Sequence, residues 1–212
     1  MGQQQGPLVL QMKDTVIVFA RAPRLGAVKR RLAREIGDRA ALRFHRETLL
    51  GLLRSLRRER RFRTFLALTP DGARDRIGPN IPRIGQGNGD IGARMDRAAR
   101  RFPKGRVAII GCDIPAANAA DARAAFRALG RHDAVFGPAM DGGFWLVALG
   151  PRRPSQPFVK ARWSTPHALA DTLDNFIGHR VTYGRRLRDV DQASDLPDVS
   201  RYRRTPIKDR TA

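Results

Sequence analysis

Short apolar runs alternate with amphipathic segments along most of this chain, and this alternation constrains the fold more than any other feature. The run Thr15–Ala20 is largely apolar and rich in β-branched residues, which is typical of a strand buried on both faces of a parallel sheet. Further strands are predicted at 63–69, 81–84, 106–111, 134–137, 144–149 and 180–183, and helices at 27–36, 39–60, 91–102, 118–130 and 164–176. This order predicts a three-layer α/β/α sandwich with a mainly parallel, mixed sheet.

The length of the chain fits one domain. With 212 residues, 42% of them hydrophobic, it can bury one core of ordinary size. We expect a single domain at 13–200, a flexible tail at 1–12 and a basic tail at 201–212. The apolar runs are shorter than the roughly 18–20 residues of a membrane span. The single cysteine excludes an intrachain disulfide, so a reducing cytoplasm is the expected location.

The net charge of +21 raises the alternative of a nucleic-acid-associated binding module. The densest run of cations, Arg54–Arg63, has two interpretations: a phosphate-binding strip, or a solvated helix end whose cations complement the helix dipole. The second is favoured because the excess charge is spread along the chain and aromatic residues are only 7%, few for stacking on single strands. The charge favours anionic ligands in general, phosphates included.

Polar motifs follow the predicted strands directly, where open α/β sheets bind their ligands. After the first strand, a loop with Pro23 and Gly26 leads to Lys29, Arg30 and Arg31. Glycine-containing loops that open a helix present backbone N–H groups to anions, and the cations would add to this. The spacing is neither that of the P-loop nor that of the dinucleotide motif, so a purely structural basic turn is an equal alternative.

Asp113 and its neighbour Cys112 follow a second buried strand in the segment Gly111-Cys-Asp-Ile-Pro115. A carboxylate delivered into the crevice at this point is suited to Mg²⁺, although it could equally cap a helix. Cys112 is predicted to be a small packed residue, because no base in the local pattern would activate it as a nucleophile.

Three further motifs have structural interpretations, and for two of them the residues also allow a functional one. Asp141-Gly-Gly143 is either a hairpin turn or a close approach of backbone to ligand. The segment from Trp163 to His167 has the chemistry of a helix start with its cap and proline. Asp191 is a second metal carboxylate or a helix N-cap, and Asp38 is expected to cap the helix that follows it.

Taken in order, these motifs resemble the glycosyltransferase-A-like family of small bacterial proteins called radical-SAM/selenodomain-associated transferases. The matching segments are Phe19–Pro23 with Gly26, Val28, Lys29, Arg31 and Leu32, then Gln86–Met95, Gly111–Pro115, Gly137–Leu146, Trp163–Thr165 and Asp189–Leu196. The resemblance covers roughly residues 14–200. It implies the nucleotide-diphospho-sugar transferase (GT-A-like, Rossmann-like) fold.

The resemblance also implies an activity: metal-dependent transfer from a nucleotide-sugar or nucleoside-triphosphate donor to a small-molecule acceptor, with Mg²⁺ or Mn²⁺ as cofactor. The fold alone does not choose between glycosyl and nucleotidyl transfer. The catalytic residues implied are Lys29, Asp113 and Asp141, and the implied metal ligands are Asp113 and Asp191.

The implied binding residues form two sets. The nucleotide would be bound by Arg21, Pro23, Gly26, Lys29, Arg31, Gln86, Gly87, Gly89, Asp90 and Arg94, with Gln86, Gly87 and Gly89 meeting the base. The sugar or acceptor would be bound by Asp141, Gly142, Gly143, Trp163, Ser164 and Thr165.

The chain departs from the family pattern at several positions. Arg21 and Arg30 stand where lysine and threonine are usual, Cys112 where serine is, and Phe144-Trp145 where two tyrosines are. The last change removes two hydroxyls, so they cannot serve as hydrogen-bonding groups here. A catalytically degenerate member that regulates a neighbour is a further alternative. Retention of the acidic and basic motif residues argues against it: Lys29, Asp90, Arg94, Asp113 and Asp141.

Overall fold

The computed structural model describes residues 14–75, 77–103 and 105–196 of the chain. Its centre is a seven-stranded sheet with the order β3-β2-β1-β4-β6-β5-β7. The strands are β1 (Asp14–Arg21), β2 (Phe62–Thr69), β3 (Arg83–Gly85), β4 (Val107–Gly111), β5 (Ala134–Pro138), β6 (Phe144–Leu149) and β7 (Val181–Tyr183). β6 runs antiparallel to β4 and β5, whereas the other neighbouring strands pair in parallel. The predicted mixed, mainly parallel α/β sheet is therefore confirmed.

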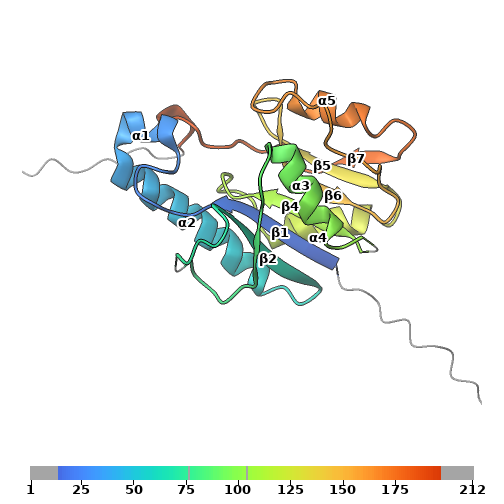
Figure 1. Ribbon diagram of the computed structural model, residues 1–212, viewed down its shortest axis with the longest axis horizontal. Coiled ribbons are helices and arrows are strands. Elements are labelled where there is room, and N and C mark those ends of the chain that lie inside the picture. Colours follow the sequence, from blue (N-terminus) through green and yellow to red (C-terminus); the bar gives the residue numbers. More distant parts are fainter. Residues whose placement is uncertain (1–13, 76, 104, 197–212) are drawn as a thin grey trace, which may run out of the picture.

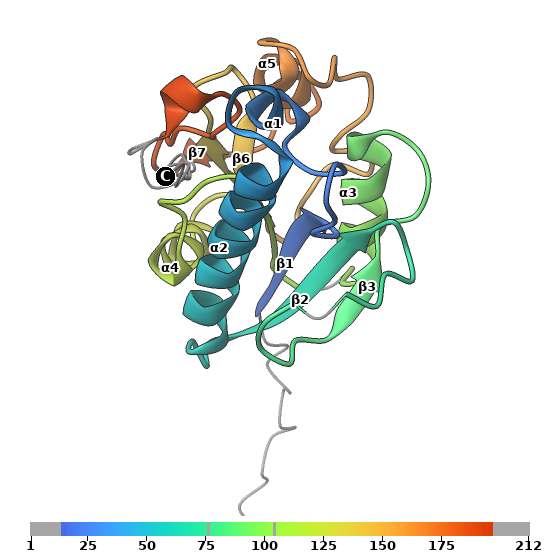
Figure 2. The same ribbon diagram turned by 90° about the vertical axis from the view of Figure 1, so that its left-hand side faces the viewer.

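Helices cover both faces of the sheet, as Figures 1 and 2 show. They are α1 (Arg30–Ile36), α2 (Asp38–Arg57), α3 (Ile91–Arg100), α4 (Ala119–Ala128), α5 (Ala168–Asp174) and the short 3₁₀ helix η1 (Ala193–Asp195). α2 and α4 pack on one face, and α3 and α5 pack on the other. Alternate residues of β1 pack on opposite faces of the sheet. Val16 and Val18 face α2, whereas Ile17 and Phe19 face α3.

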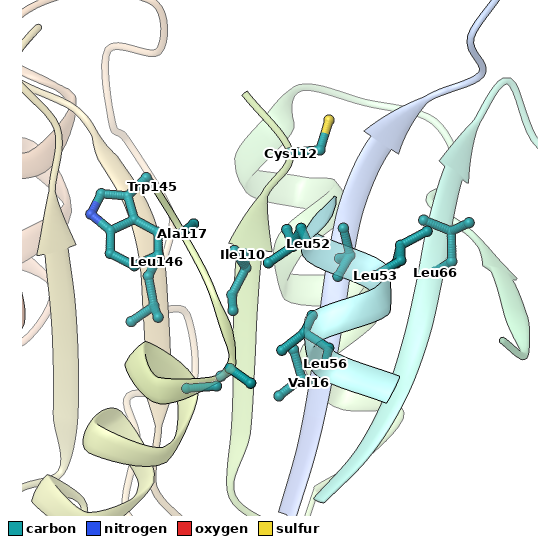
Figure 3. Packing of buried hydrophobic residues seen from close by; sticks show 14 of the residues in the cluster. Val16, Leu52, Leu53, Leu56, Leu66, Ile110, Cys112, Ala117, Trp145 and Leu146 are labelled. Carbon is teal, nitrogen blue, oxygen red and sulfur yellow. The ribbon is translucent and has the colours of Figure 1, made fainter. Parts of the chain in front are cut away.

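The α2 face of the sheet holds the larger of these two core clusters (Figure 3). Leu52, Leu53 and Leu56 lie near the carboxyl end of α2 and pack against strand residues such as Val16 and Ile110. Burial of each such leucine contributes about 1.5–3 kcal/mol. This packing holds α2 along β1 and so fixes the position of His45, which lies on the same buried side of the helix.

Several helix boundaries differ from those predicted. α1 begins at Arg30 rather than 27, because its N-cap Lys29 has a left-handed backbone, with φ 47°. α5 begins at Ala168 rather than 164, after Ser164 at φ 61°. The expected cap at Asp38 was wrong: the N-cap of α2 is Gly37, and no side chain caps it. The predicted tails at 1–12 and 201–212 lie outside the described residues.

The strand order places a switch point between β1 and β4. The chain leaves β1 through α1 and α2 to reach β2 on one side, and β4 pairs with the other side of β1. From β4 the chain continues through α4 to β5, on the side of β4 away from β1. Open α/β sheets bind ligands beyond the carboxyl ends of the strands at such a switch point. In the described part of the chain, no helix combines the length and apolarity needed to cross a membrane.

Candidate functional site

Two neighbouring cavities lie at the carboxyl ends of β1 and β4, and Asp113 lines both. The first, which we call the cationic pocket, has a volume of about 490 Å³. The second, the aromatic pocket, has a volume of about 240 Å³. The structure thus brings residues from all the chain's motifs to one edge of the sheet, as the sequence predicted for ligand-binding residues of this fold.

Lys29 links three separate segments in the cationic pocket. Its Nζ lies 3.2 Å from Oδ2 of Asp113 and 3.0 Å from Oδ1 of Asp191, and its side chain is only 5% exposed. Burial by itself would lower the pKa of Lys29, but the two carboxylates outweigh this and raise the pKa above its ordinary value. Lys29 is therefore a fixed positive charge at the switch point.

The two carboxylates that hold Lys29 are the expected metal ligands. The side chains of Asp113 and Asp191 are 49% and 42% exposed. Neither caps a helix: Asn118 caps α4, and Gln192 occupies the N-cap of η1. The helix-cap alternatives for these two aspartates were therefore wrong. Arg31, 3.5 Å from Asp191 Oδ2, adds a second cation on the exposed side.

The Gln86 side chain supports the pocket from within. Its amide nitrogen donates to the carbonyl oxygens of Ala20 and Ala67, at 3.1 and 2.8 Å, and so ties the ends of β1 and β2 together. Its amide oxygen accepts from the Arg94 guanidinium at 3.3 Å. Both amide protons are thus engaged in the buried interior. This geometry favours a structural role for Gln86, which holds β1, β2 and Arg94 in place, over the implied role of binding the base. Arg94 is the group of this pair that can contact a ligand in the cavity.

Other nucleotide-binding candidates shape loops around the cavity. Asp90 caps α3 by accepting from the Ala93 N–H at 2.7 Å. The N–H of Gly87 donates to the Asp71 carboxylate, at 3.0 Å from its Oδ2. Gly87 and Gly89 have φ values of 75° and 99°, which glycine adopts without strain. Candidates that line neither of the two pockets are Pro23, Gly26, Arg31, Gly87, Gly89, Asp90, Gly142 and Asp191.

His45 lines the cationic pocket and was missed by the sequence analysis. Its ring is 3% exposed, Nε2 lies 3.0 Å from the Arg21 carbonyl oxygen, and Nδ1 has no hydrogen-bond partner among the described residues. Burial lowers the pKa of His45, so the ring is neutral at pH 7 and Nε2–H donates to Arg21. The available signal was its place on the leucine face of a predicted helix, four residues before Leu49.

Cys112 is buried beside this histidine. Its Sγ lies 3.6 Å from Asp113 Oδ1, and the side chain belongs to the core cluster beneath α2. Burial raises the pKa of the thiol well above its ordinary value, with the charge of Asp113 adding to the effect. The prediction that Cys112 is a packed residue is confirmed.

The aromatic pocket has an apolar wall and an acidic rim. Its wall is formed by Phe19, Ile91, Met95, Phe144, Trp145 and Trp163. Trp163 lies edge-on to Phe144, with ring centroids 6.1 Å apart, and packs against Gly92 of α3 so closely that a Cβ there would lie 2.6 Å from its ring. This contact joins the segment after β6 to α3.

Three aspartates form the acidic rim: Asp113, Asp141 and Asp189. Asp141 Oδ1 accepts from the Gly143 N–H at 2.9 Å, which stabilises the turn between β5 and β6. Burial raises the pKa of Asp189, and repulsion from Asp141 raises it further. Asp189 was part of a recognised motif but was not among the predicted site residues.

Ser164 and Thr165 also line the aromatic pocket. The Thr165 hydroxyl donates to the Arg162 carbonyl oxygen at 2.7 Å and accepts from the His167 N–H at 3.2 Å, so it stabilises the turn before α5. The predicted helix cap in this motif was therefore wrong: the N-cap of α5 is His167, with no side-chain cap among the described residues.

The Arg54–Arg63 run lies at the end of α2 and the start of β2. Its arginines are exposed, and Arg54 and Arg57 occupy the last turn of the helix. The predicted helix end with cations near its carboxyl terminus is therefore observed. Glu59 within the run pairs with Arg123 at 3.0 Å.

Comparisons with known proteins agree with this fold. Residues 52–165 match a family model described as "Uncharacterized protein conserved in bacteria (DUF2064)". Of the solved structures, one described as a "putative nucleotide-diphospho-sugar transferase" from Desulfovibrio desulfuricans G20 is similar with a TM-score of 0.81 and 27% identity, over 87% of this chain and 85% of that chain.

Two more distant neighbours share the fold alone. One is 4-diphosphocytidyl-2C-methyl-D-erythritol synthase from Anaerococcus prevotii, with a TM-score of 0.56 and 12% identity, over 87% of this chain and 95% of that one. The other is 2-C-methyl-D-erythritol 4-phosphate cytidylyltransferase from Thermus thermophilus, with a TM-score of 0.51 and 14% identity, over 90% and 97% of the two chains. No curated protein gives a significant match. The matches confirm the superfamily that the sequence resembles and carry nothing on a radical-SAM association.

Proposed function

Because the chain belongs to the DUF2064 family and has a nucleotide-diphospho-sugar transferase-like fold, we propose that it is a metal-dependent transferase with a nucleotide or nucleotide-sugar donor. The observation that carries this proposal is the position of Lys29: a buried ammonium held by Asp113 and Asp191 at the switch point of the sheet. A cation-lined cavity on one side of Asp113 and an apolar cavity on the other provide room for two substrates.

The donor phosphates are assigned to the cationic pocket. Lys29, Arg21, Arg30 and Arg94 line it, and phosphate oxygens form strong charge-assisted hydrogen bonds with such groups. In phosphoryl and glycosyl transfer of this kind the protein contributes mainly positioning and electrostatic stabilisation of the leaving group. A lysine whose protonated form is stabilised is suited to that task throughout the physiological pH range.

Asp113 and Asp191 would hold the divalent cation, Mg²⁺ or Mn²⁺. Their carboxylate oxygens are the hard donors that these ions prefer, and both side chains are half exposed. The two carboxylates together carry more negative charge than Lys29 neutralises. The ion would neutralise charge on the phosphates of the leaving group. Lys29 and Arg94 would share that task from the protein side.

The acceptor is assigned to the aromatic pocket. Its wall would take an apolar portion of the molecule, and its rim offers Asp141 and Asp189 to a hydroxyl or amine that attacks the donor. A carboxyl whose pKa is raised, as at Asp189, is a better general base near neutral pH than an ordinary aspartate. Release of pyrophosphate or of nucleoside diphosphate would identify the transfer as nucleotidyl or glycosyl.

Calorimetric titration with a panel of nucleoside triphosphates and nucleotide sugars, with and without Mg²⁺ or Mn²⁺, tests the proposal. At least one nucleotide should bind, more tightly with the ion, and Asp113→Asn should lose the ion dependence while staying folded. Asp96→Asn is the matched control, because Asp96 forms a surface i,i+4 pair with Arg100 away from the pockets. Absence of binding by every nucleotide, or an unchanged ion dependence in Asp113→Asn, would contradict it.

A further inference from the structure

The two oxygens of Asp113 face different chemistry. Oδ2 contacts the ammonium of Lys29 at 3.2 Å, whereas Oδ1 faces the Cys112 Sγ at 3.6 Å and the His45 Nδ1 at 4.0 Å. The three donor atoms on the Oδ1 side all lie within 4.8 Å of one another. We propose that His45, Cys112 and Asp113 form a binding site for a first-row transition-metal ion of borderline softness, such as Zn²⁺ or Co²⁺.

His45 is the strongest part of this argument. The ring is 97% buried, being 3% exposed, yet its Nδ1 has no hydrogen-bond partner among the described residues. Buried polar atoms are normally paired, so an unpaired imidazole nitrogen directed at a carboxylate and a thiol requires an explanation. Its other nitrogen donates to the Arg21 carbonyl oxygen at 3.0 Å. Metal-binding histidines have this arrangement, in which the second nitrogen donates to a backbone carbonyl or carboxylate and fixes the tautomer.

The separations fit an ion after small side-chain movements. Bonds of about 2.0–2.3 Å from Zn²⁺ to nitrogen, oxygen and sulfur place neighbouring tetrahedral ligands about 3.3–3.8 Å apart. The Asp113–Cys112 distance of 3.6 Å lies in this range, and the Asp113–His45 distance of 4.0 Å is slightly longer.

The donor set determines the class of ion. Mg²⁺ takes oxygen ligands almost exclusively, whereas imidazole and thiolate favour Zn²⁺ and Co²⁺. As the Cys112 sulfur–metal bond forms, the thiol proton passes to the buffer. All three residues line the cationic pocket, so the fourth position would be open to water or to an oxygen of a ligand bound there, as in catalytic rather than structural metal sites.

This inference does not rest on the proposed transferase activity. It concerns the Oδ1 side of Asp113, and it would hold for a protein that binds no nucleotide. Conversely, a nucleotide and Mg²⁺ or Mn²⁺ could bind on the Lys29 side of Asp113 in a protein whose His45 and Cys112 bind nothing.

Co²⁺ titration of the chelator-treated, reduced protein tests the site by absorption spectroscopy. One equivalent should produce d–d bands of a low-coordinate ion and a near-ultraviolet charge-transfer band from thiolate to Co²⁺. Because Cys112 is the chain's only cysteine, this band can arise from no other residue of the monomer. Zn²⁺ should abolish the bands by competition, and excess Mg²⁺ should leave them unchanged.

Two variants distinguish the ligands. Cys112→Ser should abolish the charge-transfer band. His45→Gln should weaken Co²⁺ binding by at least about 10- to 100-fold, the scale on which even partners outside the ligand shell affect metal affinity. Circular dichroism checks that each variant is folded. If a variant does not fold, the absorption spectrum of the Co²⁺-loaded wild-type protein still tests the site. Absence of the thiolate band in the wild-type protein, or Co²⁺ affinity unchanged in folded His45→Gln, would overturn the inference. Nucleotide titration of the wild-type protein in Mg²⁺ reports separately on the proposed function.

Discussion

The cationic and aromatic pockets share Asp113 but have opposite linings. The cationic pocket is formed by the loop after β1 and by α2 and α3, which bring Lys29, His45 and Arg94 to it. The aromatic pocket is formed around the start of β6 and the segment before α5, which bring Phe144, Trp145 and Trp163. The difference indicates two ligands of different chemistry, one anionic and one with an apolar portion, that meet at a single carboxylate.

Removal of the fixed charge at Lys29 should have the largest effect and should affect only the cationic pocket. Lys29→Met should weaken nucleotide binding about 10- to 100-fold, because charge-assisted hydrogen bonds contribute about 1.5–3 kcal/mol each. Calorimetry with the nucleotide found in the wild-type screen measures the loss.

Lys160→Met is the matched control for Lys29→Met. Both lysines have a left-handed backbone, with φ values of 58° and 47°, but Lys160 is exposed and lines neither pocket. An equal loss of affinity in the two variants would show that general charge, rather than the position of Lys29, attracts the nucleotide.

A methyl group at Gly92 should disturb the aromatic side alone. The added Cβ would lie 2.6 Å from the Trp163 ring and 2.7 Å from the Phe158 carbonyl oxygen. Gly92→Ala should therefore lower the free energy of unfolding by about 1–3 kcal/mol, the usual cost of overpacking. Denaturant titration measures it.

Gly51→Ala is the opposite case, a helical glycine of α2 with no atom within 4 Å of an added Cβ. Alanine favours the helix there, so this variant should gain about 0.5–1 kcal/mol. Two substitutions of the same kind should thus change stability in opposite directions. A stabilised Gly92→Ala would contradict the packing described for Trp163.

Titration of His45 should give a smaller effect, confined to the cationic side. Its folded-state pKa is lowered, so the unfolded chain binds more protons than the folded one as the pH falls through the ordinary histidine value of about 6.5. The free energy of unfolding of the metal-free protein should therefore fall from pH 7.5 to 5.5, by at most about 1.4 kcal/mol per pH unit.

His45→Gln should flatten this dependence, because glutamine can still donate to the Arg21 carbonyl oxygen but does not titrate. The other histidines are common to both proteins and cancel in the comparison. Parallel stability curves for the two proteins would show that His45 is not held neutral.

The fold could be predicted from the sequence because its strands are continuous apolar runs. The bounds of β1 and β6 were predicted nearly residue for residue, because a strand buried on both faces is a continuous apolar run in the sequence. The start of α1 could not be predicted, because the local sequence does not indicate the left-handed backbone conformation of Lys29. The carboxylates that hold its side chain, those of Asp113 and Asp191, are distant in the chain and equally invisible in the local sequence.

The candidate site was predicted where a motif marks it. Asp113 and Asp141 follow strands in recognisable segments, and both line a pocket. His45 lies within a helix whose pattern is that of an ordinary core face, so its encounter with Cys112 and Asp113 depends on tertiary packing alone. Gln86 shows the reverse: a residue in a strong motif whose amide is engaged in the interior.

The most direct test of the account is Mn²⁺ binding in the presence of the nucleotide that calorimetry identifies. Binding is measured as the decrease in the electron paramagnetic resonance signal of free Mn²⁺. The wild-type protein should take up Mn²⁺ more tightly with the nucleotide than without it, because Asp113 and the donor phosphates would hold the ion together. Asp113→Asn should lose this cooperative uptake, and Asp96→Asn should retain it. Equal Mn²⁺ uptake by the wild-type protein and Asp113→Asn would contradict the claim that Asp113 binds the ion together with the nucleotide.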